Sequence, residues 1–140
     1  MQKPKITENC IVIPSSQDFL CDVDMFIEGI LRGYGADESV IADIAISVSE
    51  LVNNAIAHGN AKNDSKKVTV DIIKNSDVVT ISVQDEGGGF NPNNLSDPLA
   101  EENLLKEVGR GIFIVKSLMD KVDIKPSPLG TKIIMTKSIR

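Results

Sequence analysis

Residues 50–59 of this chain read ELVNNAIAHG, and the rest of the sequence is organised around this stretch. As a helix, it places Glu50, Asn54 and His58 one turn apart along a single face. The opposite side is apolar and is expected to pack on a sheet through Ile44, Val48, Leu51, Ala55 and Ile56. A carboxylate, a carboxamide and an imidazole on one face of an apolar helix fit a site for a metal ion and a polyphosphate. The alternative is a solvated polar face.

The composition predicts one domain over residues 1–140. The 140 residues are 41% hydrophobic, which is enough for one core. The net charge is −5, from 20 acidic and 15 basic residues, and no basic cluster stands out. Because contacts to a nucleic-acid backbone need a positive patch, we expect no direct nucleic-acid partner.

Targeting and redox features predict a soluble cytoplasmic protein. Residues 1–13 hold no apolar run long enough for a signal peptide, and we expect no later segment to span a bilayer. The two cysteines, Cys10 and Cys21, lack metal-like spacing, and His58 is the only histidine. We therefore expect no zinc site, no disulfide scaffold and no membrane partner.

The segment before residue 50 predicts a strand and two helices. Residues 10–13 form a short apolar run that suits a first strand. Ser15 followed by Asp18 resembles a capping box, which would start a helix that stops near Gly33. Its apolar positions at helical spacing are Phe19, Val23, Phe26, Ile27, Ile30 and Leu31. Asp37 can then cap the helix that carries ELVNNAIAHG.

A β-hairpin is predicted next. Residues 68–73 alternate between a buried and an outer face, as in a strand. Residues 75–77, Asn-Ser-Asp, are residue types favoured in turns, so residues 78–84 are expected to return as the second strand. The inward face of this second strand is formed by Val79, Ile81 and Val83. Because side chains along a strand alternate, we expect Asp85 to continue on that inward face.

An inward carboxylate at Asp85 needs hydrogen-bond donors, because burying a charge without them is costly. The exocyclic amine of a bound purine would be such a donor. The alternative is that Asp85 caps a local turn before Gly87. Residues 87–90 read GGGF, and a glycine run lets the backbone take positive φ and come close to a ligand.

Residues 91–108 are long for a structureless connection, which favours a lid over a linker. Residues 109–111, GRG, then open a helix whose apolar positions are Ile112, Val115, Leu118, Met119 and Val122. Glycines at a helix N-terminus expose backbone N–H groups to a phosphate, although the Gly-Lys-Ser/Thr of a Walker loop is missing. A tight turn entering the helix is the alternative.

Two more strands are predicted at residues 122–125 and 131–136. Thr131, Ile133 and Met135 share one face of the last strand, so Thr131 is also expected to point inward. All these elements together predict an α+β fold. It is a two-layer sandwich with helices on one face of a mixed, largely antiparallel sheet.

Four stretches in this order resemble the N, G1, G2 and G3 boxes of the GHKL ATPase/kinase superfamily. They are Glu-x-x-x-Asn-Ala-x-x-His-Gly at 50–59, Asp-x-Gly-x-Gly-Phe at 85–90, Gly-Arg-Gly at 109–111 and Gly-Thr at 130–131. The resemblance covers nearly the whole chain and implies a Bergerat-type ATP-binding fold. Within the superfamily, residues 109–120 are most similar to anti-sigma factors with serine-protein kinase activity, the bacterial RsbW and SpoIIAB type.

This resemblance implies that ATP and Mg²⁺ bind between the sheet and the helices. Glu50 would be the general base, and Asn54 would bind Mg²⁺. Asp85 would take the adenine amine, with Thr131 nearby. The residues that would approach the base and ribose or cradle the phosphates are Gly87, Gly89, Gly109, Arg110 and Gly111. A basic lid residue near the phosphates would be Lys106 or Arg110, and the sequence does not decide between them.

The resemblance also implies the partners. Such a protein sequesters a sigma factor until an anti-sigma factor antagonist releases it, and it phosphorylates a serine of that antagonist. A homodimer is implied as well. One departure concerns residues 112–113, Ile-Phe, where histidine kinases and gyrase-like members usually carry a further glycine.

Other functions of this superfamily are weighed against the same residues. A sensor histidine kinase would need a helical segment with the phosphoacceptor histidine before its ATP domain, and a gyrase-like clamp would need a transducer domain. We expect neither within these residues. The closer rival is an ATP-binding interaction module without kinase activity. Glu50 argues against it, because binding alone needs no base.

Overall fold

The computed structural model of the chain describes residues 3–60, 65–87, 110–128 and 130–139. One six-stranded sheet runs through it in the order β1-β2-β3-β4-β6-β5. The strands are β1 (Lys5–Ile6), β2 (Cys10–Pro14), β3 (Lys67–Asn75), β4 (Val78–Gln84), β5 (Lys121–Ser127) and β6 (Gly130–Ser138). All pairings among these described strands are antiparallel. The α+β class is confirmed, and where a mixed, largely antiparallel sheet was expected, the described strands are antiparallel throughout.

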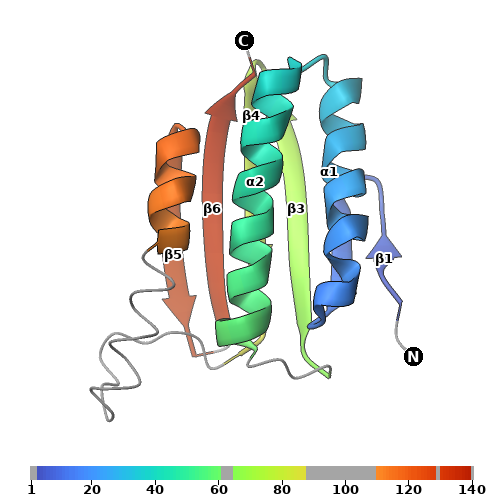
Figure 1. Cartoon of the computed structure of the whole chain (residues 1–140), viewed down its shortest axis with the longest axis vertical. Coiled ribbons are helices and arrows are strands. Elements are labelled where there is room, and N and C mark those ends of the chain that lie inside the picture. Colours follow the sequence, from blue (N-terminus) through green and yellow to red (C-terminus); the bar gives the residue numbers. More distant parts are fainter. Residues whose placement is uncertain (1–2, 61–64, 88–109, 129, 140) are drawn as a thin grey trace.

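Helices cover one face of the sheet, as Figure 1 shows. A short 3-10 turn, Gln17–Phe19, leads into α1 (Leu20–Gly33). The longer α2 (Glu38–Asn54) continues into a π-helical turn, Ala55–Gly59. A further helix over residues 110–118 lies in front of β5 in Figure 1. The result is the two-layer sandwich that the sequence predicts.

The hydrophobic core lies between α2 and the central strands. The predicted apolar stripe is buried throughout, with no member more than 6% exposed: Ile44, Val48, Leu51, Ala55 and Ile56. The sheet contributes side chains that are at most 2% exposed: Val68, Val70, Ile72, Val79, Ile81 and Val83. Burying one such aliphatic side chain contributes about 1.5–3 kcal/mol, so this packing fixes α2 against the sheet.

The start of the chain differs from the prediction. β1 was missed, because two residues are too few to show strand alternation. The N-terminal cap is Ser16, whose Oγ accepts the backbone N–H of Asp18 at 3.2 Å. Ser15 instead donates its hydroxyl to the carbonyl of Lys66 at 2.8 Å. Asp37 is the N-cap residue of α2 by position, without a capping hydrogen bond from its side chain.

The helix over residues 110–118 is shorter than predicted. Val122 belongs to β5, where it pairs with Met135. At the helix C-terminus, the Lys137 ammonium donates to the carbonyl of Leu118 at 2.5 Å and lies 3.6 Å from the Asp43 carboxylate of α2. A cation near the C-terminus of a helix interacts favourably with the negative end of the helix dipole. Lys137 therefore ties the helix to α2 at the end away from its glycine.

The helical segment Glu38–Ala57 is apolar and long enough to cross a membrane by length and composition. By length and composition alone, this segment differs from the expectation that nothing after residue 13 could span a bilayer. In this fold 50% of its apolar window is buried, and the buried side of α2 packs in the core against the sheet. The core helix of a protein that does not span a membrane can have the same length and hydropathy, so these two properties alone are weak evidence for a membrane span.

Candidate functional site

The first part of the candidate site joins α2 to the helix over residues 110–118. Glu50 and Asn54, one turn apart on α2, both face Gly111 at the start of that helix. A Cβ placed on Gly111 would lie 2.8 Å from Nδ2 of Asn54 and 3.2 Å from Oε2 of Glu50. The structure thus brings these three predicted residues together. A helix N-terminus carries free backbone N–H groups and partial positive charge, so this contact forms a seat for an anion beside a carboxylate.

The carboxamide of Asn54 is left ready for a ligand. Its Nδ2 atom is buried and has no hydrogen-bond partner among the described residues. Leaving a buried donor unpaired costs about 1–3 kcal/mol. A polar ligand in contact with this amide would remove that cost.

A π-helical turn follows Asn54 immediately. It closes with the backbone N–H of Asn60, which donates to the carbonyl of Ala55 at 2.8 Å. A π turn holds more residues than an α turn, so spacing beyond Asn54 no longer follows 3.6 residues per turn. The prediction that His58 continues the face of Glu50 and Asn54 therefore stays a prediction. The His58 side chain lies outside the described part of the chain.

The second part of the candidate site surrounds Asp85, which is 6% exposed. The predicted inward orientation is confirmed. Its Oδ1 atom accepts the backbone N–H groups of Gly87 at 3.1 Å and Thr131 at 3.0 Å. Its own backbone N–H donates to the carbonyl of Thr131 at 3.0 Å. Both side-chain bonds go to Oδ1, and Oδ2 accepts none of the hydrogen bonds found in the described residues.

Both side-chain hydrogen bonds of Asp85 bear on its two interpretations, and its role toward a purine stays a prediction. The bond from Gly87 is the local turn contact that the alternative predicts. The bond from Thr131 comes from another strand and cannot belong to a local turn. Burial raises the pKa of Asp85, and the two backbone N–H donors and the nearby Lys66 ammonium offset part of that increase. Asp85 is thus a desolvated carboxylate whose Oδ2 has no hydrogen-bond partner in the part of the chain that the structure describes.

Gly130 is what allows β6 to come this close. Its φ of +142° lies in a region that favours glycine, and a Cβ there would lie 2.1 Å from the carbonyl oxygen of Asp85. Next to it, the Oγ1 of Thr131 is buried without a hydrogen-bond partner among the described residues. Sequence reasoning named Thr131 as a site residue and left Gly130 as part of a motif. The structure gives Gly130 the role of a close backbone approach.

The sequence reasoning missed Asn60. Its side chain is 1% exposed and bonds to residues on three strands or their ends. The available signal was an asparagine placed directly after the helix-ending glycine. Several predicted features lie outside the described residues, namely Gly89, Lys106, Gly109 and the proposed lid at 91–108. Arg110 is described and exposed, and Gly87 is buried.

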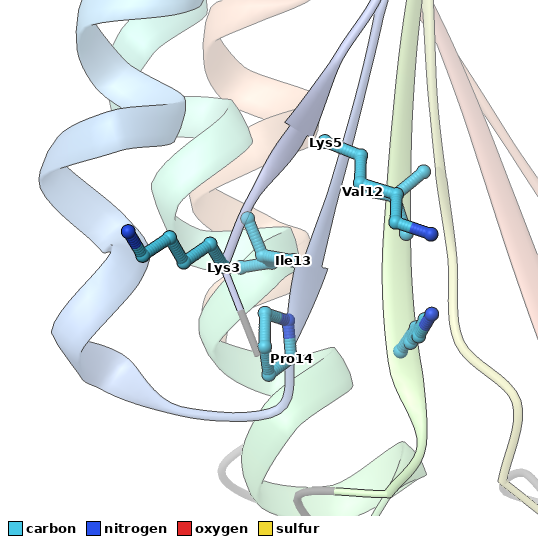
Figure 2. Close-up of a pocket in the computed structure, with 6 residues that line it drawn as sticks. Lys3, Lys5, Val12, Ile13 and Pro14 are labelled. Carbon is cyan, nitrogen blue, oxygen red and sulfur yellow. The ribbon is translucent and has the colours of Figure 1, made fainter. Parts of the chain in front are cut away.

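A hollow elsewhere in the fold lacks the predicted chemistry. It measures about 160 Å³ at the edge strands and is lined by Lys3, Lys5, Val12, Ile13, Pro14 and Lys67. Figure 2 shows that Lys3 and Lys5 point to opposite sides of the strand pair, so these ammonium groups do not converge on one ligand. None of the predicted site residues lines this hollow.

A match to a family of domains and the similarity to a known protein both indicate the same family. Residues 13–137 match the family of histidine kinase-like ATPase domains. Serine-protein kinase RsbW of Staphylococcus aureus is 30% identical over 137 residues, covering 91% of this chain and 84% of that protein.

Solved structures share the fold. The RsbU and RsbW domains of Rv1364c from Mycobacterium tuberculosis match with a TM-score of 0.70 at 24% identity, over 99% of this chain and 33% of that one. The SiaB–SiaC complex from Pseudomonas aeruginosa matches with a TM-score of 0.57 at 16% identity, over 99% of this chain and 90% of that one.

Proposed function

The chain belongs to the histidine kinase-like ATPase family, in its RsbW-like branch, and we propose that it is an ATP-dependent serine-protein kinase that acts as an anti-sigma factor. Its protein substrate is an anti-sigma factor antagonist in a partner-switching pathway. The observation that carries this proposal is the contact of Glu50 and Asn54 with Gly111. A carboxylate and a carboxamide beside the positive end of a helix support a phosphoryl-transfer site, in which Glu50 would be the base.

The described residues fit both the adenine end and the phosphate end of ATP. Within the described ranges, Oδ2 of Asp85 has no hydrogen-bond donor and would accept one such as the adenine amine, and the buried Thr131 hydroxyl beside it is also unpaired. The N-terminus of the helix over residues 110–118 offers backbone N–H groups to the phosphates. Unpaired buried polar atoms thus occur both at the adenine end and at the phosphate end, in Thr131 and in Asn54.

The described residues also fit Mg²⁺ as the metal. They contain no group of three or more histidine, cysteine and acidic side chains that could enclose an ion. Mg²⁺ usually keeps several waters and binds through one or two protein oxygens together with substrate phosphates. The carboxamide oxygen of Asn54 would be such a ligand. When bound, the metal would neutralise charge on the phosphates.

Glu50 supplies the proton chemistry. The substrate serine oxygen forms a bond to the γ-phosphorus of ATP while the bond from that phosphorus to the ADP oxygen breaks. The serine proton passes to the Glu50 carboxylate, and ADP leaves with the bridging oxygen. The protein contributes mainly positioning and charge stabilisation in such a transfer.

Three further parts of the proposal rest on the family resemblance. The protein binds a sigma factor as well as the antagonist, works as a homodimer, and is cytoplasmic. For the homodimer, exposed apolar side chains in the first strand and first helix give additional support, since Ile6 is 60% and Met25 is 68% exposed. Sedimentation as a monomer at micromolar concentration, with and without ATP, would count against the homodimer.

The kinase proposal is tested with partners recovered from the source cell. A pull-down with and without ATP, read by mass spectrometry, identifies the antagonist and the sigma factor. Transfer of the label from γ-labelled ATP to a serine of the recovered antagonist is the expected result. Binding of ATP without transfer to any recovered partner would instead favour the alternative, an interaction module without kinase activity.

A further inference from the structure

Asn60 connects three parts of the sheet through its buried side chain. Its Nδ2 donates to Oγ of Ser15 at 2.6 Å, beside β2, and to the carbonyl of Lys67 at 3.0 Å, in β3. Its Oδ1 accepts the backbone N–H of Glu86 at 2.9 Å, just beyond β4. The side chain is 1% exposed, so these bonds are made away from bulk water.

These bonds require a carboxamide in one orientation. The carbonyl of Lys67 can only accept, and the N–H of Glu86 can only donate. The Ser15 hydroxyl gives its proton to the carbonyl of Lys66, so it accepts from Asn60. Both protons on Nδ2 and one lone pair on Oδ1 are therefore used. An aspartate would direct an oxygen at the carbonyl of Lys67.

The bond to Glu86 acts next to Asp85. On one side of Asp85, its own backbone N–H is held by the carbonyl of Thr131 in β6. On the other side, the peptide N–H of Glu86 is held by Asn60. None of the hydrogen bonds found for Asn60 reaches the Asp85 carboxylate. Its effect on that carboxylate passes through the backbone.

Asn60 also belongs to the segment that carries Glu50 and Asn54. Its backbone N–H closes the π-helical turn on the carbonyl of Ala55, directly after α2. One residue therefore links the helix with the phosphate-facing residues to the peptide that carries the adenine-facing carboxylate. The two parts of the candidate site are held in register through it.

We propose that Asn60 is a positioning residue that sets the Asp85 carboxylate for a 6-amino purine and so determines the preference for adenine. This inference rests on the proposed function, in which Asp85 accepts the amine of ATP. Without the Asn60 side chain, the Glu86 peptide loses its anchor, and Oδ2 of Asp85 is no longer held at one position. The phosphates would contact other residues, at Gly111, so two nucleotides with the same triphosphate differ only in their contacts at the adenine end.

The test compares two nucleotides that differ only at the exocyclic amine. ATP and purine riboside triphosphate, which carries hydrogen in place of that amine, are titrated calorimetrically against the wild type, Asn60→Ala, Asp85→Asn and the double variant. We expect the wild type to prefer ATP by roughly tenfold, the scale of one buried hydrogen bond. Asn60→Ala and Asp85→Asn should each reduce that preference below about threefold, and the double variant should reduce it no further.

Ser15→Ala is the matched control. It removes a bond of Asn60 at the side away from Asp85, so it should lower thermal stability and leave the nucleotide preference within about twofold of wild type. This separates a positioning role from a general loss of stability. If Asn60→Ala does not fold, Asn60→Ser is measured with the same expectation, because its short side chain cannot reach the Glu86 N–H and the Lys67 carbonyl together.

Two outcomes would overturn the inference, and they are distinguishable. A wild-type preference that Asp85→Asn abolishes and the Asn60 variant keeps would remove Asn60 from adenine selection, with the proposed function intact. A wild type that binds both nucleotides equally would contradict adenine recognition by Asp85, and this inference would fall with it.

Discussion

Gly111 lies so close to Asn54 that a Cβ on the glycine would be 2.8 Å from Nδ2 of the carboxamide. Real Cβ atoms essentially never approach a heavy atom this closely. The helix over residues 110–118 therefore meets α2 through bare backbone, directly at the side chain proposed to bind Mg²⁺. The same hypothetical Cβ would be 3.2 Å from Oε2 of Glu50, so the backbone of Gly111 lies against both side chains.

The first prediction concerns Gly111→Ala. The added methyl group must displace the carboxamide of Asn54 or the helix N-terminus, and either change disturbs the phosphate end of the site. We expect ATP affinity to fall by at least roughly tenfold, since misplacing a few polar contacts costs on the order of 1–3 kcal/mol. Calorimetric titration with Mg²⁺-ATP measures this.

Gly29→Ala is the control for that prediction. Gly29 lies within α1, and no heavy atom would be within 4 Å of a Cβ there. Alanine in a helix is favoured over glycine by about 0.5–1 kcal/mol, so this variant should be slightly more stable and bind ATP normally. Equal ATP affinity of Gly111→Ala and the wild type would show that the contact between Gly111 and Asn54 has no part in binding.

The second prediction is that Asn54→Ala weakens nucleotide binding far more with Mg²⁺ than without it. The carboxamide is proposed to supply an oxygen ligand, and Mg²⁺ binds through oxygen. ATP titrations in Mg²⁺ and in EDTA separate the two conditions. An equal loss in both would assign Asn54 a packing role against Gly111.

The third prediction concerns Asp85→Asn in the absence of nucleotide. Burial raises the pKa of Asp85 above its ordinary value of 3.8, so the folded state holds its proton more tightly than the unfolded state. Its contribution to stability is therefore present at low pH and is lost as pH rises from 3.8 through the higher folded value. At neutral pH the ionised carboxylate disfavours the folded state, and the neutral variant should melt at an equal or higher temperature.

The same variant should lose most of its ATP affinity, because its amide presents a donor to the adenine amine. Thermal melts of both proteins between pH 3 and 8, with the nucleotide titration beside them, measure both effects. A markedly lower melting temperature for Asp85→Asn at neutral pH would mean that the negative charge stabilises this fold. Asp85 would then have a structural role as well.

Local patterns predicted the hairpin and the inward carboxylate. The buried side chains of β3 and β4 and the direction of Asp85 follow from strand alternation, and the length of the α2 segment follows from helical spacing. The remainder depends on contacts between distant parts of the chain. The bonds from Asn60 to Glu86 and from Thr131 to Asp85 join residues 26 and 46 positions apart. Helical and strand periodicity relate only residues close together in the sequence, so they cannot predict contacts at these separations.

The π-helical turn is the other feature that sequence patterns did not predict. A helical period assigns His58 to the face of Glu50 and Asn54, and it holds only while the turn stays α-helical. The i→i+5 bond from Asn60 to Ala55 changes the turn directly after Asn54. It also directs Asn60 into the interior. The same local change explains why the role of Asn60 was missed, while the role of His58 stays a prediction.

The last prediction separates binding from phosphoryl transfer through Glu50→Gln. Glutamine keeps the size of the side chain that faces Gly111, so the helix contact is preserved, but its amide cannot accept the serine proton. The variant should bind Mg²⁺-ATP and hold its protein partner as the wild type does. Its transfer rate should fall by roughly a hundredfold or more, the scale of losing a general base. Label transfer from γ-labelled ATP to the recovered antagonist, beside a nucleotide titration of the same variant, measures the two properties separately.

Asn53→Gln on the exposed face of α2 serves as control, since it changes a neighbouring polar side chain that hydrogen-bonds Gln17 at the surface. Glu50 and Asn54 lie one helical turn apart against one glycine, so a role for Glu50 in holding the nucleotide would also lower the affinity of Glu50→Gln. Transfer at the wild-type rate would remove Glu50 from the chemistry, and the base would then have to come from another residue or from the antagonist itself.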